Sequence, residues 1–394
     1  MTEPHQIGER VRAADAAIAD VAQKFDFLLG VTPANTDEAW LEFCHSGRRV
    51  MPPLSYRPLA IDPAAERTRL NAIPLAGLED PALSELLHDK RRELLAQLGL
   101  LETRGTGDFL AGSLQLYGQV DDTLLAEARR ILVALPRVER PVDNRVRADA
   151  TEVESRARVE LEYYRARWPE LTVTIEVRDD ISALTVSHGR LLIPRRMEVD
   201  TRRVDALLQH EVGTHIVTYV NGSAQPLRVL SIGLAGYEAL QEGLAVVAEH
   251  IAGGLDAGRL RVIAARVIAA RRVGEEVEFS QLVGELVDEY AFTEKTAFGI
   301  AVRVFRGGGL TKDAIYLRGL LDVLAYLRDE RDVAPLLVGK VAFAHASLIA
   351  ALLDRRVLRA PAWVPRWLQD DVHAKRLAKV RQGVTPLDLV EGVS

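Results

Sequence analysis

Apolar residues recur at helical spacing along most of the chain and at alternating spacing in one short region. Positions repeating every three to four residues predict helices over 7–30, 81–98, 122–135, 147–167, 203–220, 237–252, 260–271, 281–305, 312–328 and 336–353. Prolines are dense over 31–63, which predicts an extended segment there because proline excludes long regular elements. We therefore expect a mainly α-helical protein.

The alternating pattern is confined to a stretch just before the helix predicted over 203–220. Residues 171–177, 183–187 and 190–193 are each typical of a strand, and His188-Gly189 predicts a tight hairpin turn. The sequence thus predicts an α+β fold, mainly α with a small antiparallel β-sheet at about 171–195. We expect a helical N-terminal region over 1–145, either a separate domain or a lid wrapping the core, and a second domain over 146–394.

Composition and charge narrow the function classes. The chain has 394 residues, of which 50 are basic and 56 acidic, giving a formal net charge of −6. This balance argues against nucleic-acid binding, which needs a basic surface. Cys44 is the only cysteine, which excludes an intramolecular disulfide and a cysteine-rich metal site. The N-terminus carries no secretory signal and no apolar stretch is long enough for a membrane span, so we expect a cytoplasmic protein.

The helix predicted over 203–220 carries a candidate metal site, His210-Glu-Val-Gly-Thr-His215. Zinc peptidases use His-Glu-x-x-His because residues four apart share one helix face, so both imidazoles reach one metal. The five-residue spacing here would turn the second imidazole about 140° away on an ideal helix. A one-residue π-type bulge near Gly213 would restore convergence. Without it, the two histidines would merely face solvent.

Catalytic zinc usually takes three protein ligands, so a third is expected on the following helix, over about 237–252. The candidate is Glu242, in the run Gln-Glu-Gly-Leu-Ala. Small neighbours such as Gly243 would let this helix approach the histidine helix. Glu238 and Glu249 lie on the same side as Glu242, so the three would form either a solvated face or a ligand with carboxylates that orient the imidazoles.

These two motifs resemble those of the QEGLA-motif family, the flavohemoglobin expression-modulating proteins, which are related to the vertebrate microtubule-associated tyrosine carboxypeptidases. The resemblance also covers Arg178-Asp-Asp-Ile-Ser182, Arg303-Val-Phe-Arg-Gly307 and Thr311-Lys-Asp with Tyr316 and Gly319. It implies a gluzincin-like zinc peptidase over 146–394. One Zn²⁺ would be held by His210, His215 and Glu242, with Glu211 as the catalytic base.

Further roles are assigned from the chemistry that such an enzyme needs. The oxyanion requires a second donor, for which Tyr316 is the first choice, ahead of Tyr290 and His250. A carboxypeptidase must also hold a terminal carboxylate. The candidates, unless they are ordinary surface cations, are Arg303, Arg306 and Lys312. A strand near 183–187 is expected to bind the peptide backbone by strand addition.

The leading hypothesis is therefore a zinc-dependent carboxypeptidase acting on the C-terminus of a peptide or protein. A second keeps the zinc in an endopeptidase, or in an aminopeptidase whose acidic cluster is Glu238, Glu289 and Glu294. A third is a catalytically silent protein that modulates gene expression through a protein partner. Such proteins usually lose the base or a ligand, and this chain keeps both. Because the sequence has no long basic tail that could bind an acidic filament, we do not expect tubulin to be the substrate. The sequence does not indicate an oligomeric state.

Overall fold

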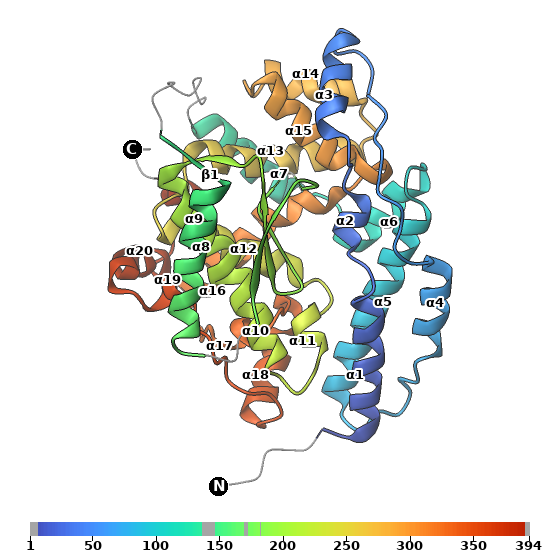
Figure 1. The fold of residues 1–394 in the computed structure, drawn as a ribbon, viewed down its shortest axis with the longest axis vertical. Coiled ribbons are helices and arrows are strands. Elements are labelled where there is room, and N and C mark those ends of the chain that lie inside the picture. The colour runs from blue at the N-terminus through green and yellow to red at the C-terminus, as the bar shows by residue number, and fades with distance from the viewer. Residues whose placement is uncertain (1–6, 136–145, 169–171, 182, 391–394) are drawn as a thin grey trace.

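The computed structural model describes residues 7–135, 146–168, 172–181 and 183–390. Helices make up most of it, with the strands gathered beside the histidine helix (Figure 1). The N-terminal helices are α1 (Glu9–Ala22), α2 (Phe27–Val31), α3 (Thr36–His45), α4 (Pro63–Ala72), α5 (Pro81–Glu102), α6 (Asp108–Tyr117) and α7 (Asp122–Ala134). In these ranges no helix is both long and apolar enough to cross a membrane.

The remaining helices alternate with short connections up to the C-terminus. They are α8 (Ala150–Arg165), α9 (Val204–His210), α10 (Val217–Ser223), α11 (Val229–Ile232), α12 (Tyr237–Ile251), α13 (Ala257–Gly274), α14 (Phe279–Asp288), α15 (Glu294–Phe305), α16 (Ile315–Arg328), α17 (Ala334–Leu337), α18 (Ala346–Asp354), α19 (Arg366–Gln369) and α20 (Asp371–Arg381). The mainly helical α+β prediction is confirmed.

The three-stranded sheet has the order β2 (Thr174–Arg178), β4 (Arg190–Pro194), β3 (Thr185–Ser187). The predicted hairpin is present, with positive φ at both His188 (47°) and Gly189 (74°), as a two-residue turn of this kind requires. Strands β3 and β4 are antiparallel as predicted, but β2 and β4 are parallel. The prediction of a purely antiparallel sheet is wrong because the hairpin places β4 in the middle, where β2 joins it running in the same direction.

A second, two-stranded sheet pairs β1 (Arg147–Asp149) with β5 (Glu198–Asp200) in antiparallel fashion. It brings the start of α8 next to the start of the histidine helix. The strand pair therefore holds the N-terminal end of the histidine helix, the helical run over 204–223 that carries His210 and His215.

Several predicted elements differ from the structure. The helix predicted over 7–30 is divided into α1 and α2, and the one predicted over 336–353 into α17 and α18. The segment predicted as extended over 31–63 contains the helix α3. The prolines lie on either side of this helix and not within it, and its Ala39 and Phe43 side chains are buried in the core. The single helix predicted over 281–305 is broken into α14 and α15. The break has a positive φ at Ala291, and the side chain of Thr293 caps the new helix.

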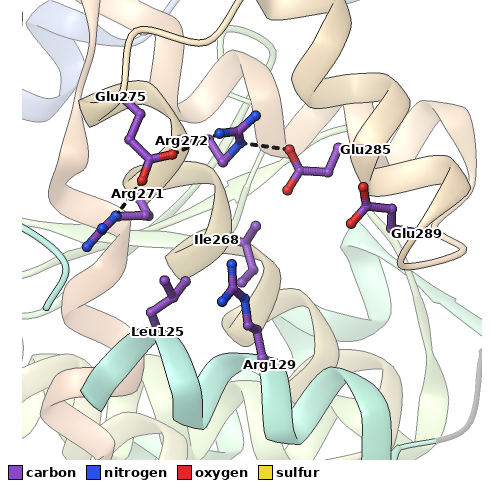
Figure 2. Close-up of a pocket in the computed structure, with 8 residues that line it drawn as sticks. All are labelled: Leu125, Arg129, Ile268, Arg271, Arg272, Glu275, Glu285 and Glu289. Atoms are coloured by element: carbon purple, nitrogen blue, oxygen red, sulfur yellow. Dashed lines mark hydrogen bonds and ion pairs between the residues drawn. The ribbon is translucent and has the colours of Figure 1, made fainter. Parts of the chain in front are cut away.

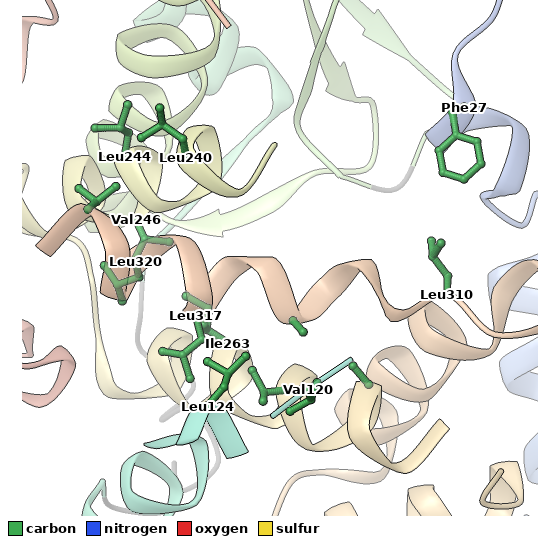
Figure 3. Close-up of a cluster of buried hydrophobic side chains, with 14 of the residues drawn as sticks. Phe27, Val120, Leu124, Leu240, Leu244, Val246, Ile263, Leu310, Leu317 and Leu320 are labelled. Carbon is green, nitrogen blue, oxygen red and sulfur yellow. The ribbon is translucent and has the colours of Figure 1, made fainter. Parts of the chain in front are cut away.

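Buried apolar side chains form two cores. The smaller joins α8, β4 and the histidine helix, through residues such as Val153, Leu191 and Leu208. The larger runs from α1 to the end of the described chain, and Figure 3 shows in it Val246 of α12 and Leu320 of α16. The N-terminal helices share this larger core with the C-terminal ones. The domain boundary near residue 145 stays a prediction.

Helices α12 and α16 approach each other closely at two glycines. A Cβ atom at Gly243 would overlap the carbonyl of Gly319, and one at Gly319 would overlap the carbonyl of Ala239. The prediction that Gly243 makes room for the histidine helix is therefore wrong, because its open side faces α16. The contact with α16 sets the position of α12, and with it that of Glu242.

We expect Gly243→Ala to lower the free energy of unfolding by about 1–3 kcal/mol, because the added methyl group forces two backbones apart. Gly284→Ala in α14 is the matched control, since a Cβ there meets nothing within 4 Å. That substitution should be neutral or stabilising by up to about 1 kcal/mol. Urea denaturation measures both, and equal effects would contradict the role of the close contact.

Candidate metal centre

The histidine helix contains the bulge that its sequence predicts. Between α9 and α10, residues Glu211–Ile216 form a π-helical turn with no break in the helix. The wider turn absorbs the extra residue, so the ring centres of His210 and His215 lie only 5.1 Å apart. The Thr214 hydroxyl donates to the carbonyl of Gln209 at 3.1 Å, which gives this oxygen a partner within the distorted turn.

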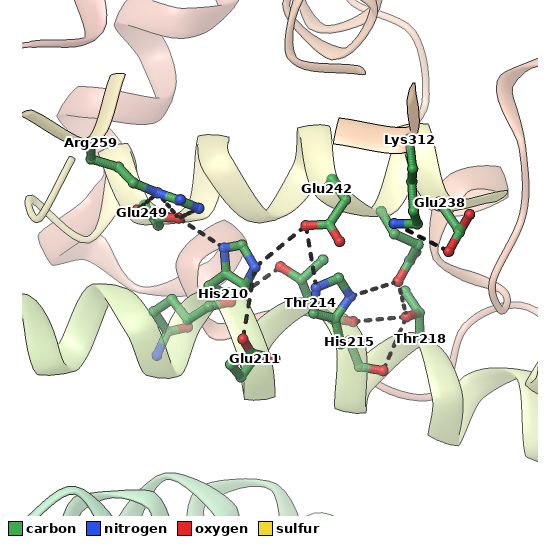
Figure 4. Close-up of polar contacts among 12 residues, drawn as sticks. His210, Glu211, Thr214, His215, Thr218, Glu238, Glu242, Glu249, Arg259 and Lys312 are labelled. Carbon is green, nitrogen blue, oxygen red and sulfur yellow. Dashed lines mark hydrogen bonds and ion pairs between the residues drawn. The ribbon is translucent and has the colours of Figure 1, made fainter. Parts of the chain in front are cut away.

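Glu242 of α12 points between the two imidazoles (Figure 4). Its Oε2 lies 3.6 Å from Nε2 of His210 and 3.9 Å from Nε2 of His215. Donors on a tetrahedral zinc ion, each about 2.0–2.2 Å from it, lie about 3.4 Å from one another. The same Oε2 is buried and has no hydrogen-bond partner. An orphaned carboxylate oxygen facing two imidazole nitrogens fits a metal ion.

Glu249 fixes the orientation of His210. Its Oε1 lies 2.9 Å from Nδ1 of His210, and Arg259 and Arg203 hold the carboxylate from behind at 3.0 and 3.6 Å. Burial alone would raise the pKa of Glu249, but Arg259 and His210 hold it well below its usual range. A carboxylate on Nδ1 leaves Nε2 free to bind a metal. Glu249 thus takes the orienting position predicted for it.

Gln241 takes the corresponding position behind His215. Its Oε1 lies 3.4 Å from Nδ1 of His215 and accepts a hydrogen bond from the Thr218 hydroxyl at 2.7 Å. Burial lowers the pKa of His215 to about 4, so the imidazole is neutral at neutral pH. Glu238, the other carboxylate considered for this task, instead pairs with Lys312 at 3.3 Å. Sequence reasoning missed Gln241, although it stands next to the ligand in the motif.

Glu211 lies on the π-helical turn, with Oε1 3.9 Å from Nε2 of His210. Burial raises the pKa of its carboxyl group to about 7, and the charge of Glu242 acts in the same direction. A carboxylate with such a pKa can both accept and release a proton near neutral pH.

Burial would raise the pKa of Glu242, but nearby basic side chains, led by His215, lower it, and the hydroxyl of Tyr316 acts in the same direction. Burial, aided by the charge of Glu242, raises the pKa of Tyr316, so it stays a neutral donor. The two alternative donors lie elsewhere. Tyr290 lies beside Arg129, and Nδ1 of His250 forms a hydrogen bond with the carbonyl oxygen of Leu389 at 2.6 Å.

Three arginines surround the buried carboxylate of Asp313. Arg303 binds it through two nitrogens, while Arg266 and Arg306 lie 3.6 and 3.9 Å away. Together they hold the pKa of Asp313 well below its usual range against the effect of burial. The Nε atoms of Arg266 and Arg306 are buried without a hydrogen-bond partner. The cluster therefore has excess positive charge and unused donors.

Arg266 was missed by sequence reasoning. It stands on α13, and its guanidinium lies 5.1 Å from the ring centre of Tyr316. Its side chain is 12% exposed, and burial lowers its pKa to about 10. The signal was available: an arginine within an otherwise apolar stretch of helix, whose neighbours are mostly buried.

The acidic residues of the aminopeptidase hypothesis do not come together. Glu289 lines a pocket of about 250 Å³ between α7, α13 and α14, and His210, His215 and Glu242 are not among the residues that line it (Figure 2). Glu294 pairs with Arg48 at 2.7 Å, and Glu238 pairs with Lys312. No acidic cluster of these three exists to hold a substrate amine.

A family model described as microtubule-associated tyrosine carboxypeptidase matches residues 41–384. The chain belongs to this family. The matched region includes every residue of the candidate metal centre, whereas α1 and α2 precede it. No curated protein sequence matches this family member. A lipoprotein of unknown function from Shewanella oneidensis is 16% identical, over 73% of this chain and 69% of that one, with a TM-score of 0.38, too low to assign a fold.

We expect Asp313→Asn to lower the free energy of unfolding by about 3–5 kcal/mol, because it leaves buried arginines without their carboxylate. Glu294→Gln is the control. It removes an ion pair with Arg48 whose two side chains are 43% and 50% exposed, and such pairs contribute about 0–1 kcal/mol. Urea denaturation compares the two. A loss for Asp313→Asn no greater than that of the control would show that the cluster does not depend on this carboxylate.

Proposed function

We propose that this chain is a gluzincin-like zinc carboxypeptidase that removes a residue from the C-terminus of a peptide or protein. The observation that carries the proposal is the approach of the unpartnered Oε2 of Glu242 to Nε2 of both His210 and His215. Two imidazoles and one carboxylate, with a further glutamate beside them, are the donor set of single-zinc peptidases. Membership of a carboxypeptidase family supports the same reaction class.

Each residue around the metal position has a task in this reaction. Zinc bound there would supply Lewis-acid chemistry, polarising the scissile carbonyl and lowering the pKa of the attacking water. Glu211 would accept the proton from that water and pass it to the leaving amine. Tyr316, kept neutral by its raised pKa, would donate a hydrogen bond to the developing oxyanion. Glu249 and Gln241 would keep the imidazoles aimed at the metal.

The arginine cluster is the proposed site for the terminal carboxylate. Of the three residues expected from the sequence, Arg306 keeps a buried Nε without a hydrogen-bond partner, and its Nη2 lies 3.9 Å from Asp313. Arg303 instead binds Asp313 through two nitrogens, and Lys312 lies 3.3 Å from Glu238. We therefore assign direct contact to Arg306 and Arg266, with Arg303 and Lys312 supporting them. A guanidinium suits this task because it can bind a carboxylate through two parallel hydrogen bonds.

The peptide backbone would lie along β3. This strand is the edge of its sheet and contacts the π-helical turn. An edge strand has unpaired backbone groups on its outer side, and these can bind an extended peptide. The hypothesis of a catalytically silent regulator has less support, because the chain keeps the candidate base Glu211 and all three ligand candidates.

Metal analysis tests the proposal directly. Wild type should hold one zinc per chain, His210→Ala should lose it, and Glu211→Gln should keep it while losing about 10²–10⁴-fold in kcat. Elemental mass spectrometry and peptide hydrolysis measure the two quantities. A wild-type protein that takes up no metal when zinc is supplied would overturn the proposal.

Arg266→Met tests carboxylate recognition. A lost hydrogen bond to a charged group is worth about 1.5–3 kcal/mol, so kcat/KM on peptides with a free C-terminus should fall about 10–150-fold. Arg271→Met on the same helix is the control, because Arg271 pairs with Glu275. Amidated peptides should be poor substrates for wild type. If Arg266→Met leaves the preference for free over amidated peptides intact, Arg266 does not bind the carboxylate.

A further inference from the structure

The π-helical turn has a close contact at Gly213, which lies between the two histidines in the sequence. A Cβ atom at Gly213 would lie 2.6 Å from Oε1 of Gln209 and 3.3 Å from Cδ1 of Trp367. The φ of Gly213 is not positive, so the glycine is not required by a left-handed backbone. What it provides is room, which the carboxamide of Gln209 and the ring of Trp367 occupy.

A chain of contacts fixes the carboxamide of Gln209 beside Gly213. Its Nε2 donates to Oε1 of Glu160 on α8 at 2.8 Å, and Nη1 of Arg366 donates to Oε2 of Glu160, also at 2.8 Å. Arg366 directly precedes Trp367 in α19, which lies beside α8 (Figure 1). Gln209, Glu160 and Trp367 are all buried. We call Gln209, Glu160, Arg366 and Trp367 the Gly213 clamp.

The clamp leaves polar atoms unsatisfied beside the turn. Oε1 of Gln209 and Nε1 of Trp367 are buried without a hydrogen-bond partner. Buried polar groups are nearly always bonded, so hydrogen bonding of Oε1 does not account for the position of this carboxamide. Contact with the turn does account for it, because the carboxamide lies where a side chain at position 213 would otherwise project.

The clamp holds the helix on both sides of a possible change in winding. Gln209 stands near the end of α9 and is fixed through Glu160, whereas Gly213 lies in the π-helical turn and packs on Trp367. Successive residues of a regular α-helix are about 100° apart. Loss of the one-residue bulge would therefore rotate one side of the turn against the other by about that angle. The helix cannot make this rotation while both contacts are kept.

We infer that Gln209 and Trp367 are positioning residues that keep the turn in its π-helical form. Helix α19, near the C-terminal end of the chain, thus helps to aim His210 and His215 at one point, although it supplies no ligand candidate. The inference rests on the proposed function, because it takes both histidines as metal ligands.

Gln209→Met tests the inference, because methionine keeps the length of the side chain and loses the hydrogen bond to Glu160. The variant should bind Zn²⁺ about 10–100-fold more weakly, the loss typical of removing a group that supports a metal ligand. Its Co²⁺-loaded form should show a changed visible absorption spectrum, because that spectrum depends on the arrangement of the ligands. A competition titration with a zinc chelator and absorption spectroscopy measure the two quantities.

Gln225→Met is the matched control. Gln225 is also buried, and both ends of its carboxamide bond the backbone of Arg359, away from the histidine pair. This substitution should lower the free energy of unfolding and leave the zinc affinity and the Co²⁺ spectrum unchanged. A general loss of stability is thereby separated from an effect on the ligands.

Gly213→Ala reaches the same contact from the turn, because the added methyl group displaces the carboxamide of Gln209, and it decides the question if Gln209→Met fails to fold. It should change the zinc affinity and the Co²⁺ spectrum in the same way. Wild-type affinity and spectrum in the folded variant would overturn the inference and leave the metal centre standing. A wild-type protein that binds no zinc would overturn the proposed function and this inference with it.

Discussion

Two imidazoles five residues apart on one helix face a common point only if the helix is wound differently between them. The π-helical turn satisfies this constraint, and the rest of the site is arranged around it. Helix α12 must bring Glu242 to the same point, and its contact with α16 at Gly243 sets how it lies. Glu249 and Gln241 then fix the rotation of each imidazole. The geometry of the three ligand candidates therefore depends on how α12 packs against α16.

Charged side chains that support the site can be told from those available to a ligand by whether they already contact an opposite charge. Glu249, Lys312 and Asp313 are buried charges, and each contacts an opposite charge that is partly exposed: Arg259, Glu238 and Arg303 respectively. Burying a charge without such a partner is costly, so these pairs are what the fold needs in order to place ionised groups inside. The buried polar atoms without a hydrogen bond include Oε2 of Glu242, Nε of Arg306 and Nε of Arg266, of which the last lies 3.6 Å from Asp313. They mark where substrate or metal would complete the site.

The sequence was informative where one helix or one turn decides the outcome. The ligand candidates, the π-type bulge, the Glu249 position and the His188-Gly189 hairpin all follow from local spacing, and the structure brings them together as expected. Features that depend on distant packing were not predictable in this way. Gly243 meets a residue 76 positions later, and β2 joins β4 in parallel only because β3 lies outside it. Arg266 acquires its setting from Asp313 and Tyr316, which no local pattern links to it.

The ligand candidates come from both apolar cores. The helix that carries His210 and His215 belongs to the smaller core, whereas α12, which carries Glu242, belongs to the larger one. An ion bound by all three would therefore connect the two cores where α12 packs against the histidine helix. Its binding energy would add to the packing of α12 against the histidine helix, since a metal site formed only in the folded state contributes to folding. Loss of the ion would then weaken the connection between the two cores.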